Sequence, residues 1–145
     1  MAASHSTDPF NLERFVTAQA PVYEDVSAEL KRGQKTSHWM WFVFPQIRGL
    51  GSSPTAQKFA ISSAEEALAY LRHPVLGARL RECTRLVIDV QGRSLNQIFG
   101  SPDDMKFRSC MTLFEHVAPQ MGEFSEALRK YCGGKPDPRT LAILN

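Results

Sequence analysis

The sequence predicts an all-α protein, a single compact domain of about seven to nine short helices. Helix-starting residues recur along the chain, followed by apolar residues three or four apart and then by a glycine or proline. No hairpin dipeptide lies between alternating segments, and no internal repeat is present. The 145 residues suit one domain, so residues 8–145 are assigned to it and residues 1–7 to a flexible N-terminal tail.

The first two helices are expected between residues 8 and 33. Asp8 is placed as the N-cap of the first, with Pro9 at the first helical position, where its missing N–H costs nothing. Pro21 ends this segment and can open the next, in which apolar residues stand four apart on one face. Gly33 supplies the C-terminal stop of that second helix.

The aromatic run "HWMWFVFPQ" at residues 38–46 is the densest apolar stretch of the chain. Thr36 and Ser37 offer caps for it, and Pro45 should end it. A helix that is apolar on every side is normally a central core helix. Its two indole N–H groups, imidazole and amide nevertheless need partners when buried. The same run could therefore line a small-ligand pocket, and both interpretations stay open.

The segment "GLGSS" at residues 49–53 is expected to be part of an ordered loop. Gly49 and Gly51 would let the backbone approach a ligand closely, and nearby N–H groups could hold an anion. The segment lacks the Lys-Ser or Lys-Thr pair of a Walker loop, and no strand precedes it. A tight turn is the simpler interpretation.

Ser63 and Glu66 then form a capping box for a further helix. Residues 73–92 carry a helical apolar stripe that begins after a proline and ends at a glycine. This stripe outweighs the β preference of "RLVIDV" within the same segment. Ser94 is expected to cap a short helix that Gly100 ends.

Ser101 is placed as the N-cap of the next helix, "PDDMKFRSCMTLFEHVA", with two acidic residues in its first turn. Asp103 and Lys106 stand three apart and could pair on one face, close to Ser109. Acidic residues at a helix start stabilise it, which is the simpler explanation. A pair directed at the aromatic run would instead bind a polar or anionic ligand or position a carboxylate for acid–base work. Two more helices are expected in "GEFSEALRKYCGG" and, from an Asp-Pro start, in "DPRTLAIL".

Composition excludes several classes of function. A formal net charge of +2 is too small to indicate a nucleic-acid or membrane partner. Three widely spaced cysteines, Cys83, Cys110 and Cys132, argue against a disulfide framework or a thiolate zinc site. The four histidines lack the spacing of metal ligands, so neither a metal nor another cofactor is expected. The chain begins without a signal-like segment, so we expect a cytoplasmic protein.

These segments together resemble a known family, the bacterial proteins called domain of unknown function 1810, which are sometimes mislabelled calpastatin. The stretches that carry the similarity are "SHWMWFVFPQ", "GLG", "FAIS", "EALAYLRHPVLGARLREC", "IFGSPDDMKF", "MTLF" and "LRKYCGGKPDPRTL". The resemblance implies a compact all-helical fold and a bacterial intracellular setting, and it implies no activity. Phe59, Phe107 and Cys110 depart from the family's common tyrosine, leucine and serine, which counts against shared chemistry through a hydroxyl at position 59 or 110. A looser similarity is to the small helical NADAR domains associated with ADP-ribose.

The first functional hypothesis is a module that binds a small polar or nucleotide-like ligand in an aromatic cleft. Trp39 or Trp41 would stack on the ligand, His38 and Gln46 would fix its orientation, and Lys106 would meet its negative charge. Gly49, Gly51 and Ser109 complete the candidate ligand-binding residues.

Two other classes of function stay open. A helical interaction module would take a peptide or partner helix in its groove. An enzyme of the N-glycosidase or hydrolase kind, acting on ADP-ribose-like nucleotides, would use Asp103 as base or charge stabiliser and His38 for proton transfer.

Overall fold

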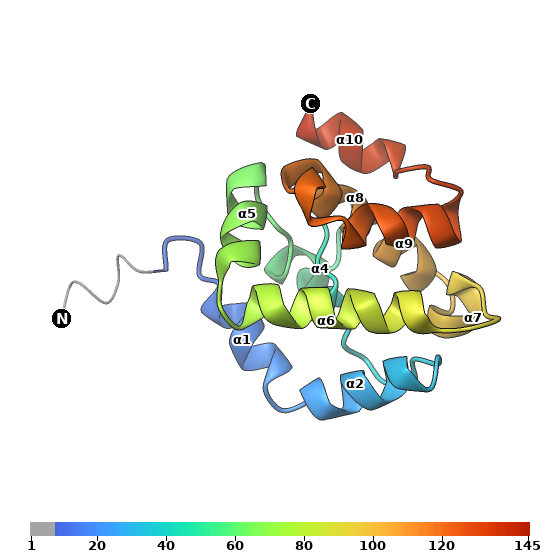
Figure 1. The fold of residues 1–145 in the computed structure, drawn as a ribbon. Helices are drawn as coiled ribbons and strands as arrows, with labels where there is room; N and C mark the ends of the chain where they lie inside the picture. Colours follow the sequence, from blue (N-terminus) through green and yellow to red (C-terminus); the bar gives the residue numbers. More distant parts are fainter. Residues whose placement is uncertain (1–7) are drawn as a thin grey trace.

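Ten α-helices and no strand make up residues 8–145, the part of the chain that the computed structural model describes (Figure 1). The predicted all-α fold is confirmed, with one helix more than the expected seven to nine because a short helix at Pro54–Lys58 is not predicted by the sequence. The expected tail at residues 1–7 lies outside the described residues. The helices are α1 (Glu13–Gln19), α2 (Tyr23–Lys31), α3 (Met40–Val43), α4 (Pro54–Lys58), α5 (Ala64–Arg72), α6 (Leu76–Asp89), α7 (Leu95–Phe99), α8 (Asp103–Val117), α9 (Glu123–Cys132) and α10 (Pro138–Leu144).

Helix α8 is the centre of the arrangement. It packs against α5, α7, α9 and α10, while α6 packs against α2, α5 and α9 on the other side of the core. In Figure 1, α6 crosses the molecule above α2, and α10 lies over α8 and α9 near the C-terminus. The α8 side chains Phe107, Met111 and Phe114 are fully buried. No helix within residues 8–145 has the length and apolar character needed to cross a membrane.

Aromatic rings join the end of the "HWMWFVFPQ" run to this central helix. The ring of Phe44 meets that of Phe107 edge-on, with 5.0 Å between centroids, and that of Phe99 at 5.8 Å. Phe99 and Phe107 stack at 5.1 Å. Such edge and offset contacts add to the burial of the rings and fix their relative orientation. The run is therefore anchored in the core at Phe44, next to the N-terminal half of α8.

The aromatic run is not the central helix that its sequence predicts. Only Met40–Val43 is helical, and Trp39, at the N-cap position, makes no side-chain cap. The buried carboxylate of Glu29 in α2 accepts hydrogen bonds from the N–H groups of Thr36 and Ser37, the Ser37 hydroxyl and the Trp39 indole, which is 2.9 Å away. Glu29 thus holds residues 36–39 in a non-helical conformation, and α3 begins only at Met40, too late for Thr36 or Ser37 to cap it.

Two other predicted caps are wrong in position. Helix α1 begins at Glu13 rather than at Pro9, because Asn11 takes a left-handed conformation (φ 53°) that interrupts a helix. The Asp8 carboxylate still accepts the N–H groups of Leu12 and Glu13, at 2.6 and 3.1 Å. Ser101 does not cap α8, whose N-cap position is Pro102. The first free N–H groups there donate to backbone carbonyls of Gly100 and Pro102 instead.

The loop after the aromatic run contains more structure than predicted. Ser53 and Pro54 start the short helix α4, with the Ser53 hydroxyl accepting the N–H of Ala56 at 3.1 Å. An isolated parallel bridge joins Ile47 to Ile61. The expected caps at Gly33 and Ser94 are confirmed, and Ser94 forms a full capping box with Gln97.

Only half of the capping box predicted at Ser63 forms, with the Ser63 hydroxyl accepting the Glu66 N–H. The Glu66 carboxylate binds Ser62 and Arg14 instead of returning to the backbone of Ser63.

Removing the Glu29 carboxylate should destabilise the protein in a pH-dependent way. Burial alone would raise the pKa of Glu29, but hydrogen bonds from Ser37, Thr36 and Trp39 outweigh it and lower the pKa from 4.5 to about 2. A lowered pKa stabilises the fold above the unfolded-state value, and this contribution is lost as pH falls from about 4.5 towards 2. We expect Glu29→Gln to cost about 3 kcal/mol near neutral pH, as measured by denaturant unfolding.

The difference between wild type and Glu29→Gln should shrink steadily below pH 4.5. Glu65→Gln in α5, an exposed position, is the matched control and should change the free energy of unfolding by less than about 0.5 kcal/mol. A difference at Glu29 that is independent of pH would contradict this account of the carboxylate.

Candidate functional site

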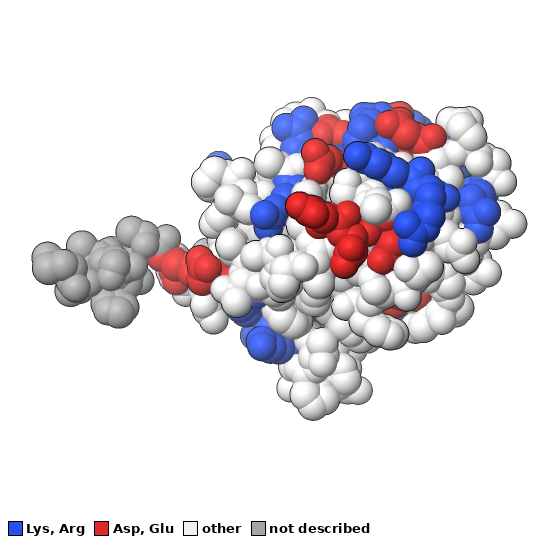
Figure 2. Space-filling model, turned by 90° about the horizontal axis from the view of Figure 1, so that it is seen from below, with Lys and Arg blue, Asp and Glu red and all other residues white. Residues whose placement is uncertain are grey.

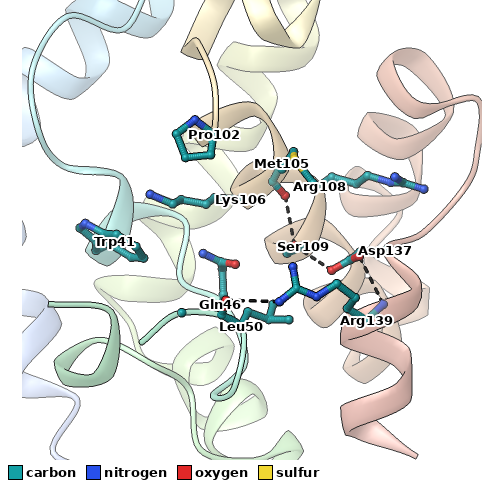
Figure 3. A pocket seen from close by; sticks show the side chains of 11 residues that line it. Trp41, Gln46, Leu50, Pro102, Met105, Lys106, Arg108, Ser109, Asp137 and Arg139 are labelled. Atoms are coloured by element: carbon teal, nitrogen blue, oxygen red, sulfur yellow. Dashed lines mark hydrogen bonds between the residues drawn. The ribbon is translucent and has the colours of Figure 1, made fainter. Parts of the chain in front are cut away.

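A cleft of about 230 Å³ lies between the loop that follows α3, the first turns of α8 and the start of α10 (Figure 3). The loop side contributes Trp41, Gln46, Leu50 and Gly51. The α8 side contributes Pro102, Met105, Lys106, Arg108 and Ser109, and the α10 side contributes Asp137 and Arg139. We call this the α8–α10 cleft.

The ammonium of Lys106 is held in the wall of the α8–α10 cleft by an aromatic ring and a carboxylate. It lies 3.6 Å from the centroid of the Trp41 ring and 3.1 Å from one oxygen of Asp103. The ring face attracts the cation through its quadrupole, and the carboxylate attracts it through its charge. Figure 3 shows the Lys106 side chain extended from α8 towards Trp41. An ammonium has three N–H donors, so these two contacts leave donor capacity for a ligand.

Asp103 holds a second lysine in the same manner. Its other oxygen lies 2.9 Å from the ammonium of Lys35, which sits 5.2 Å from the ring centroid of Trp39. Burial alone would raise the pKa of Asp103, but hydrogen bonds from Lys35 and Lys106 outweigh it and lower the pKa below its usual value. Asp103 is therefore ionised at neutral pH, and it joins the segment before α3 to the start of α8.

Asp137 ties the start of α10 to α8. One carboxylate oxygen accepts hydrogen bonds from the hydroxyls of Ser109, at 2.8 Å, and Thr140, at 2.6 Å. The N–H of Asp137 donates to the Thr112 hydroxyl at 2.8 Å. Burial alone would raise the pKa of Asp137, but the hydrogen bonds from Thr140 and Ser109 outweigh it and lower the pKa. The carboxylate in the α8–α10 cleft is thus ionised and already hydrogen-bonded.

The two arginines that line the cleft differ in how firmly they are held. Arg108 donates to the backbone carbonyls of Lys135 and Pro136 at 3.0 and 2.9 Å. Arg139 is exposed and reaches from α10 to the carbonyl of Leu50 at 3.4 Å, a long hydrogen bond that Figure 3 shows across the cleft. Arg108 therefore fixes the chain before α10, whereas the guanidinium of Arg139 keeps most of its donors free of such contacts.

Gly51 is required by the close packing of the loop on Ala56 of α4. A Cβ atom at position 51 would lie 2.8 Å from the Cβ of Ala56 and 3.7 Å from the Trp41 ring. No real Cβ tolerates the first distance, so any larger residue would displace the loop from α4. Gly49 instead has a φ of 106°, which disfavours other residues there, and it does not line the α8–α10 cleft.

The structure brings five of the predicted ligand-binding residues together at the α8–α10 cleft. They are Trp41, Gln46, Gly51, Lys106 and Ser109. The other three, His38, Trp39 and Gly49, do not line it. His38 is exposed, and Trp39 is buried against Glu29 because its indole N–H needs the carboxylate. Asp103, the other catalytic candidate, lies behind Lys106 rather than in the wall of the cleft.

Sequence reasoning missed the contribution of α10. The Asp-Pro pair at residues 137–138 is a helix-start signal, and Asp137 does accept the N–H of Arg139 at 3.3 Å. Nothing in the sequence indicates that the same carboxylate binds Ser109, which lies 28 residues earlier. Within residues 8–145 no group of three histidine, cysteine, aspartate or glutamate side chains could hold a metal ion. Cys110 is fully buried, and burial raises the pKa of its thiol.

Acidic and basic side chains form neighbouring groups on the face of the molecule that carries α2 (Figure 2). Figure 2 shows acidic side chains gathered beside basic ones on this face, which is seen from below Figure 1. No single-sign field covers it, in agreement with the small net charge of +2.

The chain belongs to the family described as "Protein of unknown function (DUF1810)", whose model matches residues 9–144. It is similar to the crystal structure of the conserved hypothetical protein Rv1873 from Mycobacterium tuberculosis. The two share 60% sequence identity over 94% of this chain and 98% of that chain, with a TM-score of 0.93. Comparison with curated proteins gives no match. The family and the all-helical fold that the sequence resemblance implies are thereby confirmed.

Replacing Asp137 with alanine should loosen α10 without unfolding the rest of the domain. The variant loses the N-cap of α10, leaves the Thr140 hydroxyl without its acceptor and leaves the Ser109 hydroxyl only the Met105 carbonyl. We expect a loss of about 2 kcal/mol in the free energy of unfolding. Hydrogen exchange should accelerate selectively in residues 138–144. Asp89→Asn, an exposed change at the end of α6, is the control, and equal acceleration throughout the chain would contradict a local role.

Proposed function

We propose that this DUF1810 protein binds a small anionic group of a ligand in the α8–α10 cleft. The observation that supports the proposal best is the Lys106 ammonium, held over Trp41 at 3.6 Å and oriented by Asp103 at the wall of the cleft. A cation whose position is fixed before binding loses little conformational freedom when a ligand arrives, and this favours affinity.

The charge of the α8–α10 cleft favours an anion. Lys106, Arg108 and Arg139 line it against a single carboxylate, Asp137. Lys106 and Arg139 keep donors for a ligand, and the planar guanidinium of Arg139 matches a carboxylate or phosphate in two parallel hydrogen bonds. The amide of Gln46 can donate to the same group or accept from a neighbouring hydroxyl.

The size of the cleft limits what it encloses. Its volume of about 230 Å³ is smaller than the roughly 300–1,000 Å³ of pockets for drug-sized ligands. A dinucleotide would therefore extend well beyond the cleft, whereas a carboxylate or phosphate with one ring or a short chain would fit. The Lys106 ammonium already occupies a face of the Trp41 ring, so the charge of Lys106 contributes more to this proposal than stacking on Trp41.

The enzyme alternative has less support from the geometry. A general base that works near neutral pH needs a pKa near 7. Hydrogen bonds lower the pKa values of both Asp103 and Asp137 below their usual range, and His38 lies outside the cleft wall. We therefore propose no reaction.

The unpaired cysteines Cys83, Cys110 and Cys132 support the cytoplasmic setting that the sequence predicts.

Binding should depend on the two cations that keep free donors. We expect Lys106→Met and Arg139→Met each to weaken binding at least about tenfold, as measured by isothermal titration calorimetry. The probes are inorganic phosphate, N-acetylglutamate amide, AMP, ADP-ribose and NAD, first screened by thermal shift. Affinity should also fall as ionic strength rises, because the attraction is between charges.

The matched control is Lys31→Met, which removes an exposed positive charge from the end of α2. It should leave the affinity unchanged within error. If no probe shifts the unfolding temperature at millimolar concentration, or if Lys31→Met weakens binding as much as Lys106→Met, the proposal is wrong.

A further inference from the structure

Met105 and Arg108 form a ridge on α8 that separates two clefts. Both residues line the α8–α10 cleft and also a neighbouring cleft of about 410 Å³. They stand three apart, so their side chains lie side by side along the helix surface. The second cleft is bounded by α7, the N-terminal half of α8 and the end of α9, and we call it the α7–α9 cleft.

One side chain of the ridge, Arg108, is held by hydrogen bonds, and the other, Met105, is apolar and exposed. The Arg108 guanidinium is fixed by the backbone carbonyls of Lys135 and Pro136, which hold the chain between α9 and α10 against α8. Met105 beside it is 61% exposed, and Met105 and Ile143 are the two large apolar side chains that are exposed within residues 8–145. A flexible thioether side chain on a surface adapts to apolar groups of a partner, and Met is enriched at protein interfaces.

The α7–α9 cleft adds apolar and amide chemistry to this ridge. Leu95, Met105 and Tyr131 contribute apolar surface. The amide of Asn96 donates to Asp104 at 3.3 Å, and its second N–H and its carbonyl oxygen remain able to pair with a peptide backbone. A small anion in the α8–α10 cleft would use none of these groups.

We propose that the natural ligand is an acidic peptide segment of a partner protein that lies across the Met105–Arg108 ridge. A glutamate or aspartate carboxylate occupies the α8–α10 cleft, and an apolar side chain of the same segment packs on Met105 and enters the α7–α9 cleft. This inference rests on the proposed function, because it takes Lys106 and Arg139 as the carboxylate site.

The two clefts together favour a segment with one acidic residue. The α8–α10 cleft is net positive and has a volume of about 230 Å³, which suits one carboxylate on a short side chain. On the far side of the ridge, Asp104 offsets Lys135, and the Arg108 guanidinium is already bound to two backbone carbonyls, so the α7–α9 cleft attracts a second acidic group less than the first cleft does. The complementary segment therefore has one acidic residue next to an apolar one rather than a run of acidic residues.

The test compares short peptides with a probe that has the carboxylate alone. An array of peptides carries one central glutamate, with a leucine moved through the other positions, and the small probe is N-acetylglutamate amide. We expect at least one leucine position to bind about tenfold or more tightly than the small probe, and the glutamine analogue of that peptide to lose binding. Fluorescence anisotropy measures the affinity of the labelled peptides, and calorimetry measures the affinity of N-acetylglutamate amide.

Met105→Ser tests the contribution of the ridge to peptide binding and does not change the buried core, because Met105 is exposed. It should remove most of the gain of the peptide over N-acetylglutamate amide, taken as the ratio of the two affinities in the same variant, because Met105 lines both clefts. Asn96→Ala, at an exposed position that lines the α7–α9 cleft and not the α8–α10 cleft, should weaken peptide binding and leave the affinity for the small probe unchanged. Ile143→Ser, which removes an apolar side chain that is 44% exposed and does not line the α7–α9 cleft, is the matched control and should alter neither. Lys106→Met should weaken both ligands.

Three outcomes would overturn the inference while leaving the proposed function intact. Either no peptide binds more tightly than N-acetylglutamate amide, or Met105→Ser leaves the gain unchanged although Lys106→Met weakens both ligands. Binding of phosphate and nucleotides without binding of any carboxylate would have the same consequence. If Lys106→Met changes none of these affinities, the proposed function itself is wrong.

Discussion

The buried carboxylate of Glu29 is the contact on which the geometry of the cleft depends. It collects hydrogen bonds from the backbone and side chain of residues 36–39 and so fixes the chain between α2 and α3. The Trp39 indole is drawn into the core by this contact. Trp41 is only half-buried at the edge of the core, and its ring faces Lys106 of α8. Trp39 therefore contributes to stability through its bond to the buried Glu29, whereas Trp41 lines the α8–α10 cleft.

Asp103 links these two tryptophans through charge. Each of its oxygens binds one lysine, and each lysine lies over one indole ring. The pairs are partly shielded from solvent, with Lys35 8% and Asp103 19% exposed, so the attraction is screened less than in a surface ion pair. Two cations share one anion, which leaves a net positive charge beside the cleft. The same carboxylate therefore contributes to the packing of α8 and holds Lys106 in the cleft wall.

Local signals in the sequence predict most of the fold, because most helices depend on residues close to one another in the chain. The apolar stripe of residues 73–92 and the cap at Ser94 are examples. The errors occur where a distant partner decides. Thr36 and Ser37 resemble caps, but their N–H groups donate to the buried Glu29 carboxylate and the helix begins only at Met40. No pattern along the chain reveals that a buried carboxylate lies there. The same limit applies to the cleft. Lys106 and Ser109 can be singled out from one helix, whereas Arg139 joins them only through the packing of α10 on α8.

Two arginines of the chain show how a structural cation differs from one that is available to a ligand. The guanidinium of Arg14 donates to four backbone carbonyls and to Glu66, all between 2.6 and 2.9 Å, and so clamps α1 onto the chain around α4 and α5. Its donors are used, so the Arg14 guanidinium itself offers little to an anion. Arg139 has one long hydrogen bond, to Leu50. Elsewhere in residues 8–145, every buried side-chain nitrogen or oxygen has a partner. The hydrogen-bond donors that remain unused are thus at the surface. At the α8–α10 cleft they belong to Lys106 on one wall and Arg139 on the other. These two cations are the physical basis for expecting an anionic group there.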